Sequence, residues 1–233
     1  MLDARRIRAI TLDLDDTLWP VWPTIRRADA ITRDWLAAHG AGNTAVRAAD
    51  AQVALQARQR VLAERPAIAH DLGALKREVI RLLLRDSGDD PALAEPAFAI
   101  FHRERQRVTL FDDALEALRF LAARWPLVAL SNGNADVAQT GVGPFFAGAV
   151  SAASVGVAKP DARIFHAGAA VGGVAPHEVL HVGDDAELDA AGALAVGMQV
   201  AWVNRDGVAW PDGRATRPQV EVRDLKMLCA ALA

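Results

Sequence analysis

Two aspartates at the end of a short apolar run constrain this chain more than any other feature. Residues 10–14 begin like a buried strand, but Asp13, Asp15 and Asp16 place three acids within four residues. Side chains two residues apart in an extended strand point to the same side, so Asp13 and Asp15 can converge on one point. Two carboxylates held together repel, and the pKa of at least one should rise unless a cation lies between them. We therefore predict a metal site or proton-transfer chemistry at this strand end.

Three further segments bring polar groups to predicted strand ends or helix starts. They are Ser131, Asn132 and Gly133 after the apolar residues 127–130, Lys159 before Pro160, and Asp184, Asp185 and Asp189 after the apolar residues 179–182. Strands that alternate with helices predict a parallel sheet covered on both faces. The carboxyl ends of parallel strands meet at one edge of the sheet, so these groups should lie close to the first two aspartates.

The order of these motifs resembles the haloacid dehalogenase superfamily. That family's pattern is Asp-x-Asp, then Ser or Thr, then Lys, then Gly-Asp-(Asp/Ser)-x-x-x-Asp, and this chain matches it at Asp13, Ser131, Lys159 and Asp184. The resemblance covers nearly the whole chain outside residues 18–107. Residues 124–135 and 180–185 look most like the corresponding segments of bacterial phosphatases that act on flavin mononucleotide and on a ribitylaminouracil phosphate of riboflavin synthesis.

The resemblance implies that Asp13 is the nucleophile and that Asp15 is the general acid and base. A carboxylate that attacks phosphorus forms an aspartyl phosphate and divides hydrolysis into two easier steps. Asp15 would protonate the leaving oxygen and then activate water. The superfamily's dehalogenases lack an acid at the position of Asp15, so its presence favours phosphoryl transfer. Asp16 is expected to serve the turn, and Thr17 to form hydrogen bonds around the nucleophile.

The resemblance also assigns the phosphoryl-binding groups. Ser131, Asn132 and Gly133 would bind the transferring phosphoryl group through the hydroxyl and nearby backbone N–H groups, and Lys159 would neutralise charge on it. Ser-Asn-Gly is also an ordinary turn sequence, and a lone lysine before a helix is usually solvated, so these assignments rest on the resemblance. His181 lies inside an apolar strand and is interpreted as a core histidine with satisfied hydrogen bonds.

A cluster of acids without histidine or cysteine ligands suits a hard cation, and we expect Mg²⁺. The ligands that the resemblance implies are Asp13, the backbone carbonyl of Asp15, and Asp184. Asp189 is expected either to hold a metal-bound water or to orient the lysine. Asp185 stands where a helix N-cap belongs.

The predicted fold is α/β, with a doubly wound, parallel, Rossmann-like sheet core and an inserted all-helical cap domain. The core is expected to comprise residues 1–17 and 108–233. The cap is expected at residues 18–107, where helical periodicity continues without a strand. The last cap helix is expected at residues 91–107, with a kink or break at Pro96. A short helix is expected near residues 135–140.

The core motifs act on the phosphoryl group alone, so we expect the cap to select the substrate and to close over the site. Trp22 is a candidate for stacking on a planar substrate, and Arg26 or Arg27 for contact with an anionic group. Packing of the hinge and an exposed helix face are the alternative interpretations of these residues.

Composition narrows the class of protein and its partners. The chain has 233 residues, a net charge of −3 and no long basic run, so nucleic acid is a poor candidate partner. We expect no membrane helix, because no segment approaches the roughly 18 apolar residues required. The first residues lack the apolar stretch of a signal peptide. The single cysteine, Cys229, cannot form an internal disulfide, and we expect a cytoplasmic protein. The expected partner is a small phosphorylated metabolite, and the expected oligomeric state is a monomer or homodimer.

The predicted function is Mg²⁺-dependent hydrolysis of a small-molecule phosphate monoester through an aspartyl phosphate. Flavin mononucleotide or a riboflavin-pathway phosphate is the candidate substrate. One alternative is a phosphomutase of the same fold that acts on a sugar phosphate with the same core residues. A second is a non-catalytic module that binds a phosphorylated ligand, and the intact set of Asp13, Asp15, Lys159 and Asp184 argues against it.

Overall fold

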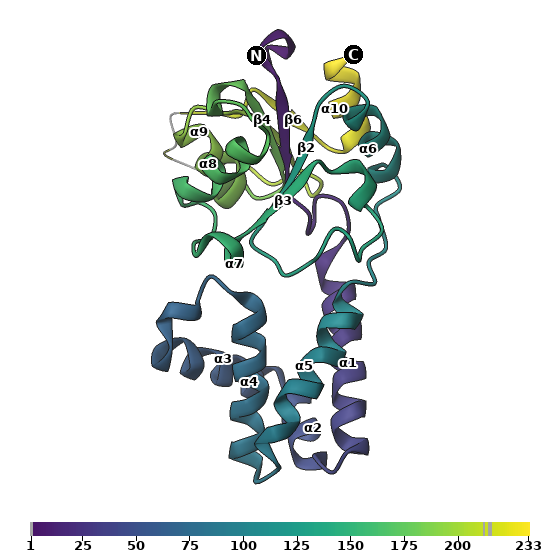
Figure 1. Ribbon diagram of the computed structural model, residues 1–233, viewed down its shortest axis with the longest axis vertical. Coiled ribbons are helices and arrows are strands. Elements are labelled where there is room, and N and C mark those ends of the chain that lie inside the picture. Colours follow the sequence, from purple (N-terminus) through teal and green to yellow (C-terminus); the bar gives the residue numbers. More distant parts are fainter. Residues whose placement is uncertain (1, 212, 214–215) are drawn as a thin grey trace. The chain divides into compact units, whose positions relative to one another are not determined.

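The structure, a computed structural model, describes residues 2–211, 213 and 216–233. It divides into two compact units, which are shown in Figure 1. The core unit consists of Met1–Pro20 and Thr109–Ala233, and the helical unit consists of Val21–Val108.

The core unit contains, in the described part of the chain, a parallel sheet of six strands. The strands are β1 (Ala9–Leu12), β2 (Leu127–Ser131), β3 (Gly148–Ser151), β4 (Val179–Gly183), β5 (Gln199–Val203) and β6 (Val220–Val222). Their spatial order is β3-β2-β1-β4-β5-β6. The chain therefore winds outward from β1 in one direction and from β4 in the other, which confirms the predicted doubly wound fold. The switch between β1 and β4 places the expected ligand site at the carboxyl ends of these two strands.

Helices cover both faces of this sheet. They are α6 (Ala114–Ala122), α7 (Ala152–Val155), α8 (Ala162–Val171), the π-helical turn η6 (Ala186–Ala191), α9 (Gly192–Ala195) and α10 (Leu225–Leu232). In Figure 1, α8 and α9 lie on one side of the sheet, and α6 and α10 lie on the other. Every residue of β1, β2, β4 and β5 is buried, as expected for parallel strands enclosed by helices.

The short helix expected near residues 135–140 is wrong, because the chain forms turns there. The carboxylate of Asp136 accepts hydrogen bonds from the backbone N–H of Ala138 and from the side chain of Gln139, at 2.9 and 2.8 Å. These local bonds compete with helical ones. Gly141, at φ 84°, then turns the backbone into the left-handed region before the 3₁₀ turn η4 (Gly143–Phe145).

The helical unit contains five α-helices among its residues. They are α1 (Val21–Ala38), α2 (Gly42–Ala49), α3 (Ala51–Glu64), α4 (Leu72–Ser87) and α5 (Ala94–Arg105). The predicted kink or break at Pro96 is wrong, because α5 is one continuous helix around this residue. Helix α5 begins at Ala94, so Pro96 lies in the first turn, where a helix does not need the missing N–H as a donor.

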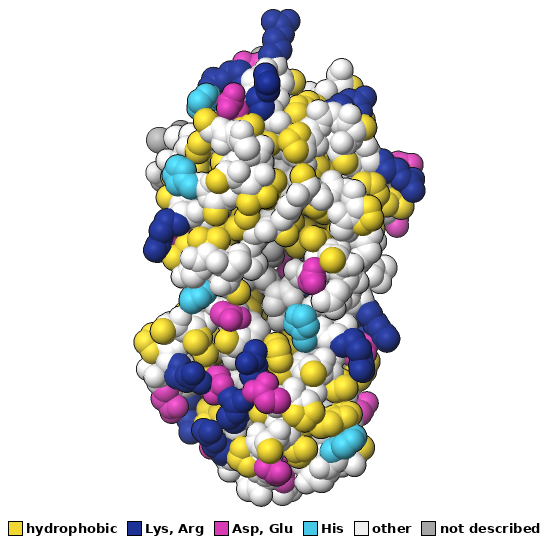
Figure 2. Space-filling view, in the orientation of Figure 1, with side chains coloured by type: hydrophobic (Ala, Val, Ile, Leu, Met, Phe, Trp, Pro, Cys, Tyr) yellow, Lys and Arg dark blue, Asp and Glu magenta, His cyan; other side chains and the backbone are white. Residues whose placement is uncertain are grey.

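Charged side chains of both signs are interspersed over the helical unit, as Figure 2 shows. Several form ion pairs between helices, including Arg60 with Asp86 at 2.5 Å and Arg65 with Glu78 at 2.8 Å. None of the helices in the described residues combines the length and hydrophobicity that a bilayer span requires.

Candidate functional site

The end of β1 and the turn after it hold the first two predicted site residues. The backbone N–H of Asp13 donates to the carbonyl of Val182 in β4, at 2.9 Å, so Asp13 still follows the sheet. Asp16 then adopts φ 57°, a left-handed conformation that Asp tolerates better than most residues. Its N–H donates to the carbonyl of Trp19 at 2.7 Å, and the Trp19 indole donates to the Asp15 carboxylate at 2.8 Å. The turn thus fixes both carboxylates beside the strand end.

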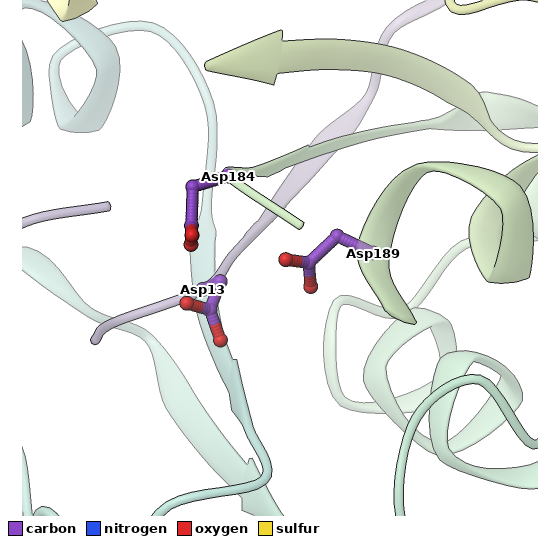
Figure 3. A group of neighbouring side chains, drawn as sticks. All are labelled: Asp13, Asp184 and Asp189. Carbon is purple, nitrogen blue, oxygen red and sulfur yellow. The ribbon is translucent and has the colours of Figure 1, made fainter. Parts of the chain in front are cut away.

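Three carboxylates converge at the carboxyl ends of β1 and β4. Asp13, Asp184 and Asp189 each offer one oxygen, and these oxygens lie within 4.8 Å of one another. Figure 3 shows Asp184 and Asp189 pointing toward Asp13. The ammonium group of Lys159 donates to Asp13 and, at 2.5 Å, to Asp189. Asp13, Lys159 and Asp189 are almost fully buried.

The backbone of Lys159 is held in place by Asn132, which follows β2. The side-chain oxygen of Asn132, Oδ1, accepts from the backbone N–H of Lys159 at 2.7 Å. The side-chain nitrogen, Nδ2, donates to the backbone carbonyl of Lys159 at 3.1 Å. The Asn132 side chain is therefore engaged with Lys159, and a phosphoryl contact would use its backbone N–H. Gly133 donates its own N–H to the Ser131 hydroxyl at 2.9 Å. The Ser131 hydroxyl remains a donor toward a ligand, since it is the acceptor in that bond.

The residues after β4 have separate roles. Asp184 accepts from the Thr17 hydroxyl at 3.0 Å, so Thr17 contacts the acid after β4 that lies in one cluster with Asp13. Asp185 caps the following π-helical turn by accepting from the N–H groups of Glu187 and Leu188, each at 2.8 Å. Its backbone N–H donates to Asp189 at 3.1 Å. This geometry agrees with the capping position expected for Asp185.

Burial and mutual repulsion control the protonation of these acids. Burial raises the pKa of Asp13 well above its usual range, although the Lys159 ammonium opposes the shift. Burial, together with the nearby charge of Asp189, raises the pKa of Asp184 to about 7. Burial also acts to raise the pKa of Asp189, but Lys159 and His181 together outweigh it and lower that pKa below its ordinary value. The neighbouring carboxylates likewise raise the pKa of Lys159 above its ordinary value, against the effect of burial.

The donor set fits a hard divalent cation. Three clustered carboxylates face one ammonium group, and Asp189 already accepts from Lys159 and from the N–H of Asp185. The raised pKa values of Asp13 and Asp184 mark the two acids that a cation would stabilise in their charged forms. Asp13 and Asp184 are therefore the candidate side-chain ligands, and Asp189 is the partner of the lysine.

A pocket of ≈ 300 Å³ adjoins the end of β2 within the core unit. It is lined in part by Leu14, Ser131, Gly133, Asn134, Asp136 and Ser151. Ser131, at the end of β2, thus borders an open space within the core unit.

The three candidate residues of the helical unit lie near the start of α1. Trp22 is 65% exposed, which is unusual for a large aromatic side chain. Arg26 is exposed, whereas the Arg27 guanidinium donates to the carbonyls of Glu104 at 3.1 Å and of Arg107. Arg27 therefore ties the two ends of the helical unit together.

Sequence and structure comparisons place the chain among known hydrolases. A family model for haloacid dehalogenase-like hydrolases matches residues 7–197. The chain is similar to the 5-amino-6-(5-phospho-D-ribitylamino)uracil phosphatase YigB of Escherichia coli strain K12, with 32% identity over 97% of each chain. It is 30% identical to the phosphoserine phosphatase of Thermus thermophilus, over 97% of this chain and 100% of that one. A crystal structure of a 2-haloacid dehalogenase from Pseudomonas syringae superposes with a TM-score of 0.89, at 35% identity, over 97% of this chain and 98% of that one.

Proposed function

We propose that this chain, which belongs to the haloacid dehalogenase-like hydrolases, is a Mg²⁺-dependent phosphatase of small phosphate monoesters that works through an aspartyl phosphate. One observation carries the proposal. Asp13, at the end of β1, receives the Lys159 ammonium and lies in one cluster with Asp184, while Asp15 follows two residues later. In the proposal Asp13 is the nucleophile, Lys159 its counter-ion, Asp184 a metal ligand and Asp15 the proton donor, all at the carboxyl end of the sheet.

In the proposed first step, a carboxylate oxygen of Asp13 attacks the phosphorus of the monoester. The new O–P bond forms as the bond from phosphorus to the leaving oxygen breaks, and Asp15 gives that oxygen its proton. Lys159 and the Ser131 hydroxyl stabilise the negative charge on the phosphoryl oxygens. The alcohol then departs, and the phosphoryl group stays on Asp13.

In the proposed second step, Asp15, now ionised, takes a proton from a water molecule. That water attacks the phosphorus, the bond to the Asp13 oxygen breaks, and inorganic phosphate leaves. The Trp19 indole holds the Asp15 carboxylate by a 2.8 Å hydrogen bond, which restricts it to one orientation for both proton transfers. Asp13 is regenerated as a carboxylate beside Lys159.

The metal would be held by the side chains of Asp13 and Asp184 and by the carbonyl of Asp15. When bound, Mg²⁺ would offset the charge of the phosphoryl group and of the attacking carboxylate, which otherwise repel each other. Thr17 orients Asp184 for this role through its 3.0 Å hydrogen bond.

A dehalogenase is the second candidate function, because of the likeness to the Pseudomonas syringae structure. Two residues favour phosphoryl transfer over carbon–halogen cleavage. Asp15 supplies an acid that the dehalogenases of the superfamily lack. Asp184 adds a second carboxylate that suits a metal, and a phosphoryl group needs such charge neutralisation more than a carbon–halogen bond does.

For the substrate, we propose flavin mononucleotide or a ribityl phosphate of riboflavin synthesis, with the helical unit as the selecting cap. The support is the likeness to the Escherichia coli ribitylaminouracil phosphatase along 97% of both chains. The exposed Trp22 in α1 offers a ring that can stack on a planar substrate.

Removal of metal is expected to stop phosphate release. With p-nitrophenyl phosphate as substrate, excess EDTA should lower kcat by at least about 100-fold, because the cation supplies several kcal/mol of charge stabilisation. Added Mg²⁺ should restore the rate. A parallel assay for halide release from 2-chloropropionate is the control. Full phosphatase activity in EDTA would refute the metal's role, and halide release without phosphate release would favour the dehalogenase.

Replacement of Trp22 by alanine is expected to impair planar substrates selectively. We expect kcat/KM for flavin mononucleotide to fall about three- to tenfold, the size of one lost ring stacking, with less change for p-nitrophenyl phosphate. Arg26→Ala is the matched variant, because Arg26 is also exposed and lies one helical turn from Trp22. It tests the candidate contact with an anionic group of the substrate in the same assays. Equal losses on both substrates would show that Trp22 acts in packing, and phosphoserine as the preferred substrate would refute the flavin assignment.

A further inference from the structure

His181, in the middle of β4, is fully buried and has hydrogen bonds at both ring nitrogens. Its Nδ1 lies 2.9 Å from the Thr11 hydroxyl of β1, the residue directly opposite in the sheet. Its Nε2 lies 3.1 Å from an oxygen of Asp189. The ring packs against Phe165 in a T-shaped arrangement, with centroids 5.2 Å apart at 89°. Side chains enclosed in this way are ordinarily apolar, and the two hydrogen bonds offset the cost of burying the imidazole here.

The partners of the ring determine which nitrogen carries the proton. Burial lowers the pKa of His181, so the ring is neutral and has one donor and one acceptor nitrogen. Asp189 is ionised beside Lys159 and can only accept. Nε2 therefore donates to Asp189, and Nδ1 accepts from the Thr11 hydroxyl. Asp189 thus fixes the tautomer, and the Thr11 hydroxyl supports it by donating to Nδ1.

One oxygen of Asp189 accepts from both His181 and Lys159. The Lys159 ammonium reaches it at 2.5 Å and His181 at 3.1 Å, while the second oxygen accepts from the Asp185 N–H at 3.1 Å. The carboxylate also packs over Gly183, where any Cβ would collide with it. Asp189 thus has a single orientation. The Lys159 ammonium, held by Asp189, also donates a hydrogen bond to Asp13.

We propose that His181 is a positioning residue: through Asp189, it holds the Lys159 ammonium against Asp13 during phosphoryl transfer. The proposal rests on the proposed function, since it assigns His181 a part in the same reaction. A continuous series of hydrogen bonds runs from Thr11 through His181, Asp189 and Lys159 to Asp13. Without the imidazole, Asp189 would keep its charge but lose one of the donors that orient it.

Kinetics of His181→Leu give the first test. We expect kcat to fall about 10- to 100-fold, as is typical when a supporting hydrogen-bond partner is lost, with little change in KM. His181→Gln, which can still donate to Asp189, should recover part of the loss. The matched control is Val200→Ala in β5, the buried neighbour of His181 in the sheet register, which alters packing without touching the hydrogen bonds. Its kcat per folded molecule should equal that of the wild type.

A double-mutant cycle distinguishes positioning from general destabilisation. If His181 acts through Asp189, then His181→Leu should cause no further loss of kcat in an Asp189→Asn background. The proposal would be overturned if the fold-losses of kcat in the two single variants multiply in the double variant. A His181→Leu enzyme with the wild-type kcat would overturn it as well. Should His181→Leu fail to fold, Thr11→Val tests the same series of bonds from its other end, and wild-type kcat in that variant would also overturn it.

¹⁵N NMR of the histidine rings provides a measurement that does not depend on activity. The chain has six histidines, and the His181→Gln spectrum identifies the one in question. We expect a neutral ring with the proton on Nε2, and a proton on Nδ1 would overturn the proposal whatever the enzyme's rate. The two possible failures are distinguishable. A wild type that hydrolyses no phosphate ester contradicts the proposed function, whereas an active wild type that tolerates His181→Leu contradicts the positioning role alone.

Discussion

Asp13→Asn is expected to lower phosphatase kcat by at least about 10³-fold, because the amide cannot attack phosphorus as a carboxylate does. The fold should survive. Asparagine has nearly the same shape as aspartate, and Lys159 keeps its contact with Asp189, so no buried charge loses its last partner. The measurement is phosphate release together with the thermal unfolding curve of each variant.

Asp16→Asn is the matched control for this substitution. Asp16 lies three residues further along the same turn and has a positive φ, which asparagine also tolerates. Its kcat should change only about a few-fold, because Asp16 is half-buried and a charge near the site is partly screened by salt. An Asp13→Asn enzyme with a rate near that of the wild type would refute the mechanism. An equal loss in both variants would show that the turn, and not the nucleophile, had been damaged.

The metal-free protein is expected to become less stable as the pH rises from about 4 to about 7. Asp184 has its pKa raised to about 7, from the ordinary value of about 3.9. Between these values the folded state binds a proton that the unfolded state has released, so the free energy of unfolding decreases with pH. A shift of this size corresponds to on the order of 4 kcal/mol. Asp13, raised in the same direction, adds to the effect.

The other shifted groups of the cluster do not reverse this trend. The pKa of Asp189 is lowered, so the stability it contributes is fully present above about pH 5. The pKa of Lys159 is raised from its already high value, so its contribution is constant below about pH 9. Mg²⁺ needs ionised carboxylates, and it should therefore raise the melting temperature much more at pH 8 than at pH 5.

Asp184→Asn tests this account with an effect of unusual sign. The variant should be more stable than the wild type at pH 8 in EDTA, by up to a few kcal/mol. It should also gain no stability from Mg²⁺ and should lose phosphatase activity. Asp206→Asn, which removes an exposed acid of the same unit, should change none of these quantities. A metal-free wild type whose melting temperature is constant from pH 5 to pH 8 would contradict the assignment.

The fold could be predicted from the sequence because its signals are local. Apolar runs such as residues 127–130 and 179–182 become strands enclosed on both faces, and the polar residues after them mark the strand ends. The errors occur where other residues override local preference. Asp136 forms turn bonds in place of the predicted helix, and the start of α5 at Ala94 makes Pro96 harmless.

The site could be predicted only as a list of residues, because its contacts join distant parts of the chain. Asn132 binds the backbone of Lys159, which lies 27 residues later in the sequence. Thr11 forms a hydrogen bond with His181, which lies 170 residues later. Neither pair has a sequence signal without the strand register. The one available clue is that Thr11, in β1, lies two residues before Asp13, which follows the strand, so the two side chains point to the same side of the extended backbone.

The central claim is that the phosphoryl group passes through Asp13, and trapping it there is the most direct test. Asp15→Asn should slow the second step more than the first when the leaving group is p-nitrophenolate, because this leaving group needs little protonation. Acid quenching during turnover, followed by borohydride reduction and peptide mass spectrometry, should convert Asp13 and no other residue into homoserine. Turnover without such a mark, or a mark on another acid, would contradict the account.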